Sequence, residues 1–427
     1  MAGARELNGS TRPAAARTNG AHDPGSLVSV TGAIYFPLAL IARFPYAMMV
    51  VGTLTLVVAG RGSLSLGGLT SAMVGLGTAC FAPLIGAAAD RWGQRRVLLA
   101  AGAVNSVALL LVTAAVFSTL GGWAVLSAAF VVGATAPQVA PMSRSRLVGI
   151  IGRRLPLARR QKVLNGTMAY ESAADEVTFV FGPVIVGLLA ATLGPAAPIL
   201  GAAVLTIVFV SAFALHRSAE EVPRNSTSSS PPAPVSELAT PRLLIVILGV
   251  LGVGFMFGAT LTSVTSFMQD AGHAERAGLV YAALGVGSAV FALAAALFPE
   301  GFTLRARWLV FSGVILAGGI ALQFAQTVPV LLLALAVVGI GIGPTLVTLF
   351  SLTAALSPRG RSATAMSLAT TGIVVGQSAA TAVAGHVGES AGTPAAMTVA
   401  LAAGVVIVVA GTLYGALVMR DRSLPGP

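Results

Sequence analysis

Twelve apolar stretches, each long enough to cross a lipid bilayer as a helix, recur along this chain and leave it one kind of fold. A helix needs about 20 mainly apolar residues to span the hydrocarbon core. Transmembrane strands would instead alternate in polarity over about ten residues, a pattern absent from this sequence. We predict an all-α integral membrane protein with helices near 34–59, 66–89, 97–118, 121–142, 165–192, 196–215, 242–267, 277–298, 306–325, 328–355, 363–387 and 395–418.

The composition agrees with membrane insertion: of 427 residues, 56% are hydrophobic and only 9% are charged. The net charge of +11 could indicate a nucleic-acid partner, but such proteins gather basic residues on one solvated face. Here the arginines are spread over short loops between apolar stretches, so we expect no nucleic-acid partner. The single cysteine, Cys80, lies within an apolar stretch and is interpreted as a packing residue.

The basic residues also predict the orientation, because short loops rich in Lys and Arg stay in the cytoplasm. If both termini are cytoplasmic, all 25 Lys and Arg residues except Arg43, Arg61 and Arg276 fall in cytoplasmic segments, and Arg144 and Arg146 are among them. We therefore expect a multi-pass protein of the plasma membrane. Basic residues between 153 and 162 are predicted to form an interfacial helix that attracts anionic membrane lipids, or to serve only as an orientation signal.

A polar segment divides the chain into two halves of six helices. It contains the run Asn225-Ser-Thr-Ser-Ser-Ser-Pro-Pro-Ala-Pro, which has nothing to bury. The predicted units are a disordered cytoplasmic tail at 1–30, an N-terminal bundle at 31–216, a flexible cytoplasmic linker at 217–241, a C-terminal bundle at 242–420 and a cytoplasmic tail at 421–427.

A short polar loop follows the second apolar stretch and reads Gly86-Ala-Ala-Ala-Asp90-Arg91-Trp92-Gly93-Gln94-Arg95-Arg96. It resembles the cytoplasmic loop between the second and third helices of major facilitator superfamily transporters. A degenerate copy, Pro299-Glu300-Gly301 followed by Arg305 and Arg307, lies at the same place in the second half. The resemblance implies two pseudo-symmetric six-helix bundles, and its closest type is the bacterial drug or metabolite efflux antiporter.

In this superfamily the loop acid latches the two halves together on the cytoplasmic side. The resemblance therefore implies that Asp90 meets the start of the helix at 363–387, where exposed amides favour an anion. Gly86, Gly93 and the arginines at 91, 95 and 96 would complete this cytoplasmic gate. Alternatively, the three arginines only enforce orientation.

Few ionisable residues lie within the apolar stretches: Arg43, Glu171, Asp175 and Glu176. A charge at the bilayer centre costs at least about 2.5 kcal/mol, so such residues usually face the bundle interior. With a helix starting near Asn165, Asp175 and Glu176 lie roughly 15 to 17 Å deep, and Glu176 is rotated about 100° from Asp175. The resemblance implies that the first and fifth helices are neighbours, so Arg43 can reach one acid. These four residues are candidates for proton coupling or substrate binding, or form a static ion pair.

Gly182, Pro183 and Gly187 resemble the glycine-proline signature of superfamily antiporters, with one extra residue after the proline. An ordinary kink with close packing is the alternative. Export antiporters usually carry an arginine in the fourth helix, whereas 126–141 holds no basic residue. We expect Arg43 to substitute for it.

A central cavity is predicted to be lined by one residue from each of four helices: Tyr46, Gln138, Phe255 and Gln377. The four histidines, 22, 216, 273 and 386, are dispersed, so we expect no metal site, no cofactor and no enzymatic activity. No ATP-binding motif is present either.

We therefore predict a monomeric secondary transporter that exports a small organic molecule by alternating access, with a proton as the coupling ion. The alternatives are a proton-coupled importer of a nutrient or metabolite and, from other classes, a lipid flippase or a membrane protein that transports nothing.

Overall fold

The computed structural model describes residues 27–220, 233–273, 277–299 and 301–423. Most of the predicted tail at 1–30, the middle of the linker at 217–241 and the last residues of the tail at 421–427 lie outside these ranges. Residues 27–30 do not belong to a disordered tail, because they form the helix α1, Leu27–Thr31, whose Leu27 and Thr31 are buried.

Among the described residues, twelve helices are long and apolar enough to cross a membrane, as predicted. In the N-terminal half they are built from α2 (Tyr35–Ile41) with α3 (Phe44–Arg61), α4 (Leu64–Trp92), α5 (Gln94–Val116), α6 (Gly122–Ala134) with α7 (Val139–Arg154), α8 (Leu157–Leu193), and α9 (Ala197–Leu205) with α10 (Ser211–Leu215). In the C-terminal half they are α11 (Pro241–Asp270), α12 (Ala277–Ala294), α13 (Leu304–Leu322), α14 (Val328–Leu356), α15 (Ser362–Ala391) and α16 (Thr393–Ser423).

The fourth span differs from the prediction of a helix ending near 142. Helix α6 ends at Ala134, the chain leaves helical geometry around Pro137, and α7 then continues to Arg154. Proline interrupts the helix because it disfavours helical geometry in the residue before it and lacks an amide N–H. The polar residues of α7 are buried inside the bundle, so the prediction from hydropathy placed the end of the fourth span too early.

The basic segment at 153–162 forms no separate interfacial helix. Its first residues close α7 and its later ones open α8, with only Leu155 and Pro156 between the two helices. The fifth span therefore begins at Leu157 rather than near Asn165.

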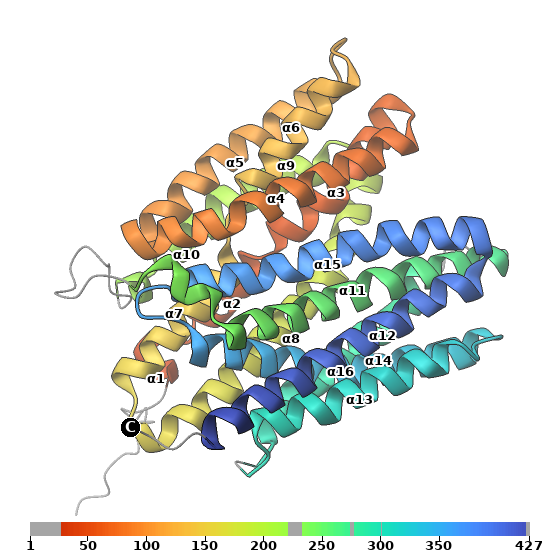
Figure 1. Ribbon diagram of the computed structural model, residues 1–427. Coiled ribbons are helices and arrows are strands. Elements are labelled where there is room, and N and C mark those ends of the chain that lie inside the picture. The colour runs from red at the N-terminus through yellow and green to blue at the C-terminus, as the bar shows by residue number, and fades with distance from the viewer. Residues whose placement is uncertain (1–26, 221–232, 274–276, 300, 424–427) are drawn as a thin grey trace, which may run out of the picture.

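The two halves meet through a few helices. Helix α4 packs against α15, α8 against α12 and α14, and α7 against α15. In Figure 1 the helices α3 to α6 and the helices α11 to α16 diverge toward the right of the view, away from the end where α1 and the end of α16 lie. We call that end, which carries both described chain ends, the terminal face.

Inside the C-terminal half, glycines bring helices into backbone contact. A Cβ atom on Gly258 of α11 would collide with the carbonyl oxygen of Gln377 on α15, and one on Gly376 with that of Leu251. Close approach of this kind requires small residues at the contact. The C-terminal core is therefore a tightly packed apolar body.

Candidate functional site

The predicted acids lie in the middle of the longest helix, α8, which has 37 residues. Because α8 starts at Leu157, Asp175 lies about 27 Å from its beginning at 1.5 Å per residue, not the predicted 15 to 17 Å. It is still midway along the helix, with about as many residues after it as before. Glu171 and Glu176 are fully or nearly fully buried.

Arg43 reaches two of these acids, as the neighbouring first and fifth helices led us to expect. It occupies the short break between α2 and α3, just before Pro45. Its Nη1 donates to Asp175 Oδ1 at 3.0 Å and to the main-chain oxygen of Glu171 at 3.0 Å, while its Nη2 donates to Glu171 Oε2. The side chain of Arg43 is 3% exposed, so this is an interior ion pair.

Arg144 is the functional candidate that the sequence interpretation missed. Predicted to lie in a loop, it is fully buried on α7, and its Nη2 donates to Asp175 Oδ2 at 2.5 Å. Its guanidinium also lies 3.8 Å from the ring centroid of Phe350 on α14, in the other half. The fourth span thus does carry an arginine, and the expectation that Arg43 replaces it is wrong.

A pattern in the sequence could have revealed α7. Val139, Ser143, Leu147, Ile150 and Ile151 recur at spacings of three to four residues and are all buried. This helical period continues past Pro141, where the apolar stretch ends. Arg144 and Arg146 are interspersed with it.

Hydroxyl groups complete the environment of Glu171. Ser143 Oγ donates to Glu171 Oε1 at 2.9 Å and lies 2.9 Å from the hydroxyl oxygen of Tyr35 on α2. We call Arg43, Arg144, Glu171 and Asp175 the charge network. With all four ionised, its two positive and two negative charges balance.

Glu176 faces away from the charge network, as its rotation on the helix predicted. Its Oε1 accepts a hydrogen bond from Ser288 Oγ of α12 at 2.8 Å. This contact joins the two halves through a buried carboxyl group. In the described part of the chain, Glu176 forms no ion pair.

The loop acid makes the contact implied by the superfamily resemblance. Asp90 accepts hydrogen bonds from the backbone N–H groups of Ala363 and Thr364, at 3.0 and 2.8 Å, and from Thr364 Oγ1 at 2.6 Å. Both amides belong to the first turn of α15, where an anion is favoured. A Cβ atom on Gly86 would come within 2.6 Å of Ser367 Oγ, so this glycine also permits the close contact of α4 with α15.

The other loop residues do not join the halves in this structure. Gly93 has a left-handed φ of 89° between α4 and α5, which glycine tolerates. Arg95 lies 3.5 Å from the exposed Glu220, the Arg91 guanidinium is 5.9 Å from the ring of Trp92, and Arg96 is exposed. A role in orientation remains the alternative for the three arginines.

Of the two glycines in the glycine-proline segment, only Gly182 is tightly packed. A Cβ atom on Gly182 would lie 2.6 Å from that of Ala47 on α3, whereas none of the described atoms lies within 4 Å of the corresponding position on Gly187. Helix α8 continues without interruption through Pro183.

The four cavity candidates are not brought together around either hollow that the structure describes. Tyr46 packs against the core of the N-terminal half, and Phe255 against that of the C-terminal half. Gln138 donates to the carbonyl oxygen of Ala136 at 2.9 Å in the break before α7, and Gln377 is half-buried on α15. Among the described residues, no group of three His, Cys, Asp or Glu side chains is placed to hold a metal ion.

Residues 35–301 match the family model described as Major Facilitator Superfamily, which covers more than half of the chain. The chain belongs to this superfamily. Major Facilitator Superfamily proteins are transporters, not enzymes, and the twelve spans described above fit that membership. A search of curated protein sequences finds no match to the chain.

Solved structures of Major Facilitator Superfamily transporters share the fold. The human organic anion transporter MFSD10 aligns with a TM-score of 0.68 and 16% identity over 91% of this chain and 100% of that one. A bacterial homologue of the iron transporter ferroportin, in an outward-facing state, aligns with a TM-score of 0.71 and 13% identity over 90% of this chain and 98% of that one. The Escherichia coli fucose:proton symporter FucP aligns with a TM-score of 0.65 and 16% identity over 90% of this chain and 99% of that one. At these identities the similarity concerns the fold alone.

Proposed function

We propose that this transporter couples proton movement to the export of a small organic molecule by alternating access. The observation that carries the proposal is the charge network, a balanced set of two arginines and two carboxylates at the middle of α8, in which Arg43, Arg144 and Glu171 are buried and the Asp175 side chain is 21% exposed. Charges at this depth are costly and are usually retained for a function such as proton relay.

A proton on Asp175 would change the contacts of both arginines. Asp175 Oδ1 accepts from Arg43 and Oδ2 accepts from Arg144, so protonation leaves a positive charge in the interior that Glu171 alone does not balance. Removing one partner of a buried ion pair is costly because the remaining charge is uncompensated. Arg144 then gains by moving toward water or toward a bound substrate.

Such a movement of Arg144 would change contacts in both halves, because Arg144 belongs to the N-terminal half and its guanidinium packs on the ring of Phe350 on α14. We infer that the moving bodies are the bundles at 31–216 and 242–420, connected by the segment at 217–241. The three hydrogen bonds of Asp90 to α15 serve as the latch that closes the terminal face. The terminal face is then the cytoplasmic one, in a plasma membrane, with both chain ends inside and the protein acting as a monomer.

The similar structures include an organic anion transporter, a homologue of an iron transporter and a sugar:proton symporter, so they support transport of several cargo classes and favour none. Export is supported by the resemblance of the segment from Gly182 to Gly187 to the antiporter signature. Tight packing of Gly182 on α3 also couples this segment to the helix that carries Arg43.

The test is a screen of candidate compounds with purified protein in liposomes under an imposed pH gradient. We expect Asp175→Asn to reduce pH-driven movement at least tenfold. The matched control is Asp270→Asn, at the far end of α11, where the carboxylate accepts from Thr393 Oγ1 outside the charge network. Undiminished proton coupling in Asp175→Asn would refute the assignment.

The direction of movement separates the remaining alternatives. Exchange of internal protons for external compound, in the orientation that places the terminal face outside the vesicle, supports export. Accumulation of compound together with protons, in vesicles with the terminal face inside, would instead identify an importer. Competition by lipids alone, with no soluble cargo, would indicate a lipid flippase.

A further inference from the structure

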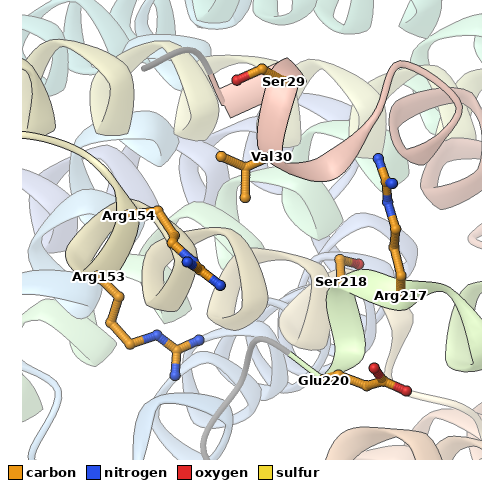
Figure 2. A pocket seen from close by; sticks show the side chains of 7 residues that line it. All are labelled: Ser29, Val30, Arg153, Arg154, Arg217, Ser218 and Glu220. Carbon is orange, nitrogen blue, oxygen red and sulfur yellow. The ribbon is translucent and has the colours of Figure 1, made fainter. Parts of the chain in front are cut away.

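A hollow of about 640 Å³ opens on the terminal face, away from the charge network. Three segments line it: α1 with Ser29, the end of α7 with Arg153 and Arg154, and the short helix η2, Arg217–Ala219, which follows α10. Figure 2 shows the three arginine side chains and the hydroxyl groups around this space, with Glu220 at its edge. The hollow is therefore bordered by donors from segments far apart in sequence.

The described lining of the hollow is strongly positive. It has three arginines and one acid, and that acid, Glu220, also lies 3.5 Å from Arg95. A fourth arginine lies behind the lining: Arg146 is fully buried and its Nη1 donates to Ser218 Oγ at 3.1 Å.

Arg146 has no acidic partner among the described residues. The described groups that accept its hydrogen bonds are all neutral: Gln94 Oε1 at 3.1 Å, the carbonyl oxygen of Phe213 at 3.0 Å and Ser218 Oγ. Its Nη2 is buried and makes no hydrogen bond in the described part of the chain. A buried charge without a counter-charge is costly, so an anion bound nearby would stabilise this region.

His216 lies within the positive field of these arginines. It lies directly after α10, beyond the sixth span, and its Nδ1 accepts from the backbone N–H of Ser218 at 3.3 Å. Burial lowers the pKa of His216 below its usual 6.5, and the charges of Arg146 and Arg217 lower that pKa further.

The position of the hollow indicates the kind of anion. Its lining residues close the fourth and sixth spans and precede the first, so they lie at the level of the lipid headgroups. Nearby Val28 and Leu157 are 42% and 79% exposed, as expected of residues that meet acyl chains. The volume is large enough for a headgroup as well as its phosphate.

We propose that this hollow is a binding site for the phosphate group of an anionic ligand, held by Arg153, Arg154 and Arg217 with help from the hydroxyl group of Ser29. Arginine suits this role because its planar guanidinium donates two parallel hydrogen bonds to phosphate oxygens. The phosphate belongs either to an anionic phospholipid or to a soluble compound. The site is independent of the transport proposal, because none of its residues belongs to the charge network.

The test compares the purified full chain in phosphatidylcholine nanodiscs with and without phosphatidylglycerol, by native mass spectrometry of retained lipid and by thermal unfolding. A parallel arm adds inorganic phosphate to the protein in phosphatidylcholine alone. We expect Arg154→Gln/Arg217→Gln to lower the retention of phosphatidylglycerol, or the protection by phosphate, at least tenfold. The matched control, Arg96→Gln/Lys162→Gln, removes two exposed charges outside the hollow and is expected to change either signal less than twofold.

Each outcome bears on the site. Protection by phosphatidylglycerol only identifies a lipid headgroup, and protection by inorganic phosphate identifies a soluble anion. Equal losses in the two double variants would mean that general surface charge, not the hollow, binds the anion, and would overturn the proposal. So would the lack of any response of the unaltered protein to either probe. If the double variant does not fold, Arg217→Gln alone is compared with Arg96→Gln by the same criteria.

Discussion

The two halves of this transporter share a fold but have opposite interiors. The N-terminal half buries Arg43, Arg144, Arg146, Glu171 and Glu176, with Asp175 between two of the arginines. In the C-terminal half, every described Asp, Glu, Lys or Arg that belongs to a span lies in the first or last turn of its helix: Arg242, Asp270, Arg305, Arg307, Glu389 and Arg420. Along the described spans, the N-terminal half therefore carries such residues in the middle of its helices, and the C-terminal half carries them only near helix ends.

Helices in this protein are held together by two kinds of contact, backbone contacts at glycines and buried ion pairs. Backbone contacts at glycines, such as Gly258 against the carbonyl group of Gln377, allow one arrangement of α11 and α15. Ion pairs such as Arg144 with Asp175 are weak evidence for stability, but their geometry depends on protonation. Glycine contacts also join α4 and α6 in the N-terminal half, where a Cβ atom on Gly133 would collide with the carbonyl oxygen of Val74. The two halves therefore differ in their buried charges, and on that ground we propose that the N-terminal half contains the switch and that the C-terminal half is the rigid half.

The largest effect is expected from Arg144→Leu, which removes the positive charge between the halves. Breaking a buried ion pair by deleting one partner typically costs about 3–5 kcal/mol. We expect a loss of this order in the free energy of unfolding, measured by thermal or denaturant unfolding, and the loss of pH-driven transport in liposomes.

A second variant distinguishes charge balance from packing. In Arg144→Leu/Asp175→Leu both partners are apolar, so the unfolding free energy is expected to recover much of the loss while transport stays absent. Unchanged stability and transport in Arg144→Leu would contradict the view that the N-terminal interior is the switch.

Arg144 also shows which parts of the structure the sequence could not predict. Hydropathy located all twelve spans, and the loop motif predicted the contact of Asp90 with α15, because both depend on local patterns. The reach of Arg43 to the acids of α8 was predicted from the superfamily arrangement of helices. The continuation of the fourth span through α7 was missed, because its polar residues are compensated by partners on α8 that hydropathy does not consider.

The four cavity candidates stay a prediction, because they line neither of the two hollows described above. Tyr46, Gln138, Phe255 and Gln377 were chosen by residue type and position, but which side of a helix faces another depends on the packing of both halves. Gln138 illustrates the point, since it lies in a break and bonds the backbone two residues away.

The next largest effect tests the rigid half. Gly258→Ala places a Cβ atom against the carbonyl oxygen of Gln377, so α11 and α15 must separate. Overpacking of this kind costs about 1–3 kcal/mol. We expect a lower unfolding temperature that changes equally at pH 5.5 and pH 7.5, because no charged group takes part.

Gly187→Ala is the matched control in the N-terminal half, where the added atom meets nothing within 4 Å. Its stability is expected to stay unchanged or to rise, since alanine favours helix over glycine. A strong pH dependence of the Gly258→Ala defect would remove the distinction between the two interiors.

A smaller effect is expected where the halves meet at the terminal face. Asp90→Asn replaces one acceptor oxygen by an N–H donor that faces the N–H groups of α15 and removes the charge that favours this helix start. A loss of about 1.4 kcal/mol changes an equilibrium about tenfold, so we expect the latch to open about tenfold more often. The measurement is the rate of maleimide labelling of Ser367→Cys in a Cys80→Ser background.

Glu220→Gln is the control for the latch, because it breaks the exposed pair with Arg95 on the same face without touching α15. Exposed pairs contribute about 0–1 kcal/mol, so labelling should change little. Equal labelling rates in Asp90→Asn and the unaltered protein would show that glycine contacts such as that of Gly86, and not the acid, hold the halves together.

The smallest effect concerns His216, which lies in the positive field of Arg146 and Arg217. Its pKa is below 6.5 in the folded protein because of burial and because of Arg146 and Arg217, so the unfolded chain takes up the proton first as the pH falls. Stability is therefore full above pH 6.5 and decreases as the pH falls from 6.5 toward the folded pKa. His216→Gln removes this contribution, so we expect its unfolding temperature to fall less between pH 7.5 and pH 5 than that of the unaltered protein. His386→Gln, on α15 in the C-terminal half, is the control and is expected to keep the original slope; equal slopes in all three proteins would mean that the field of Arg146 and Arg217 does not reach His216.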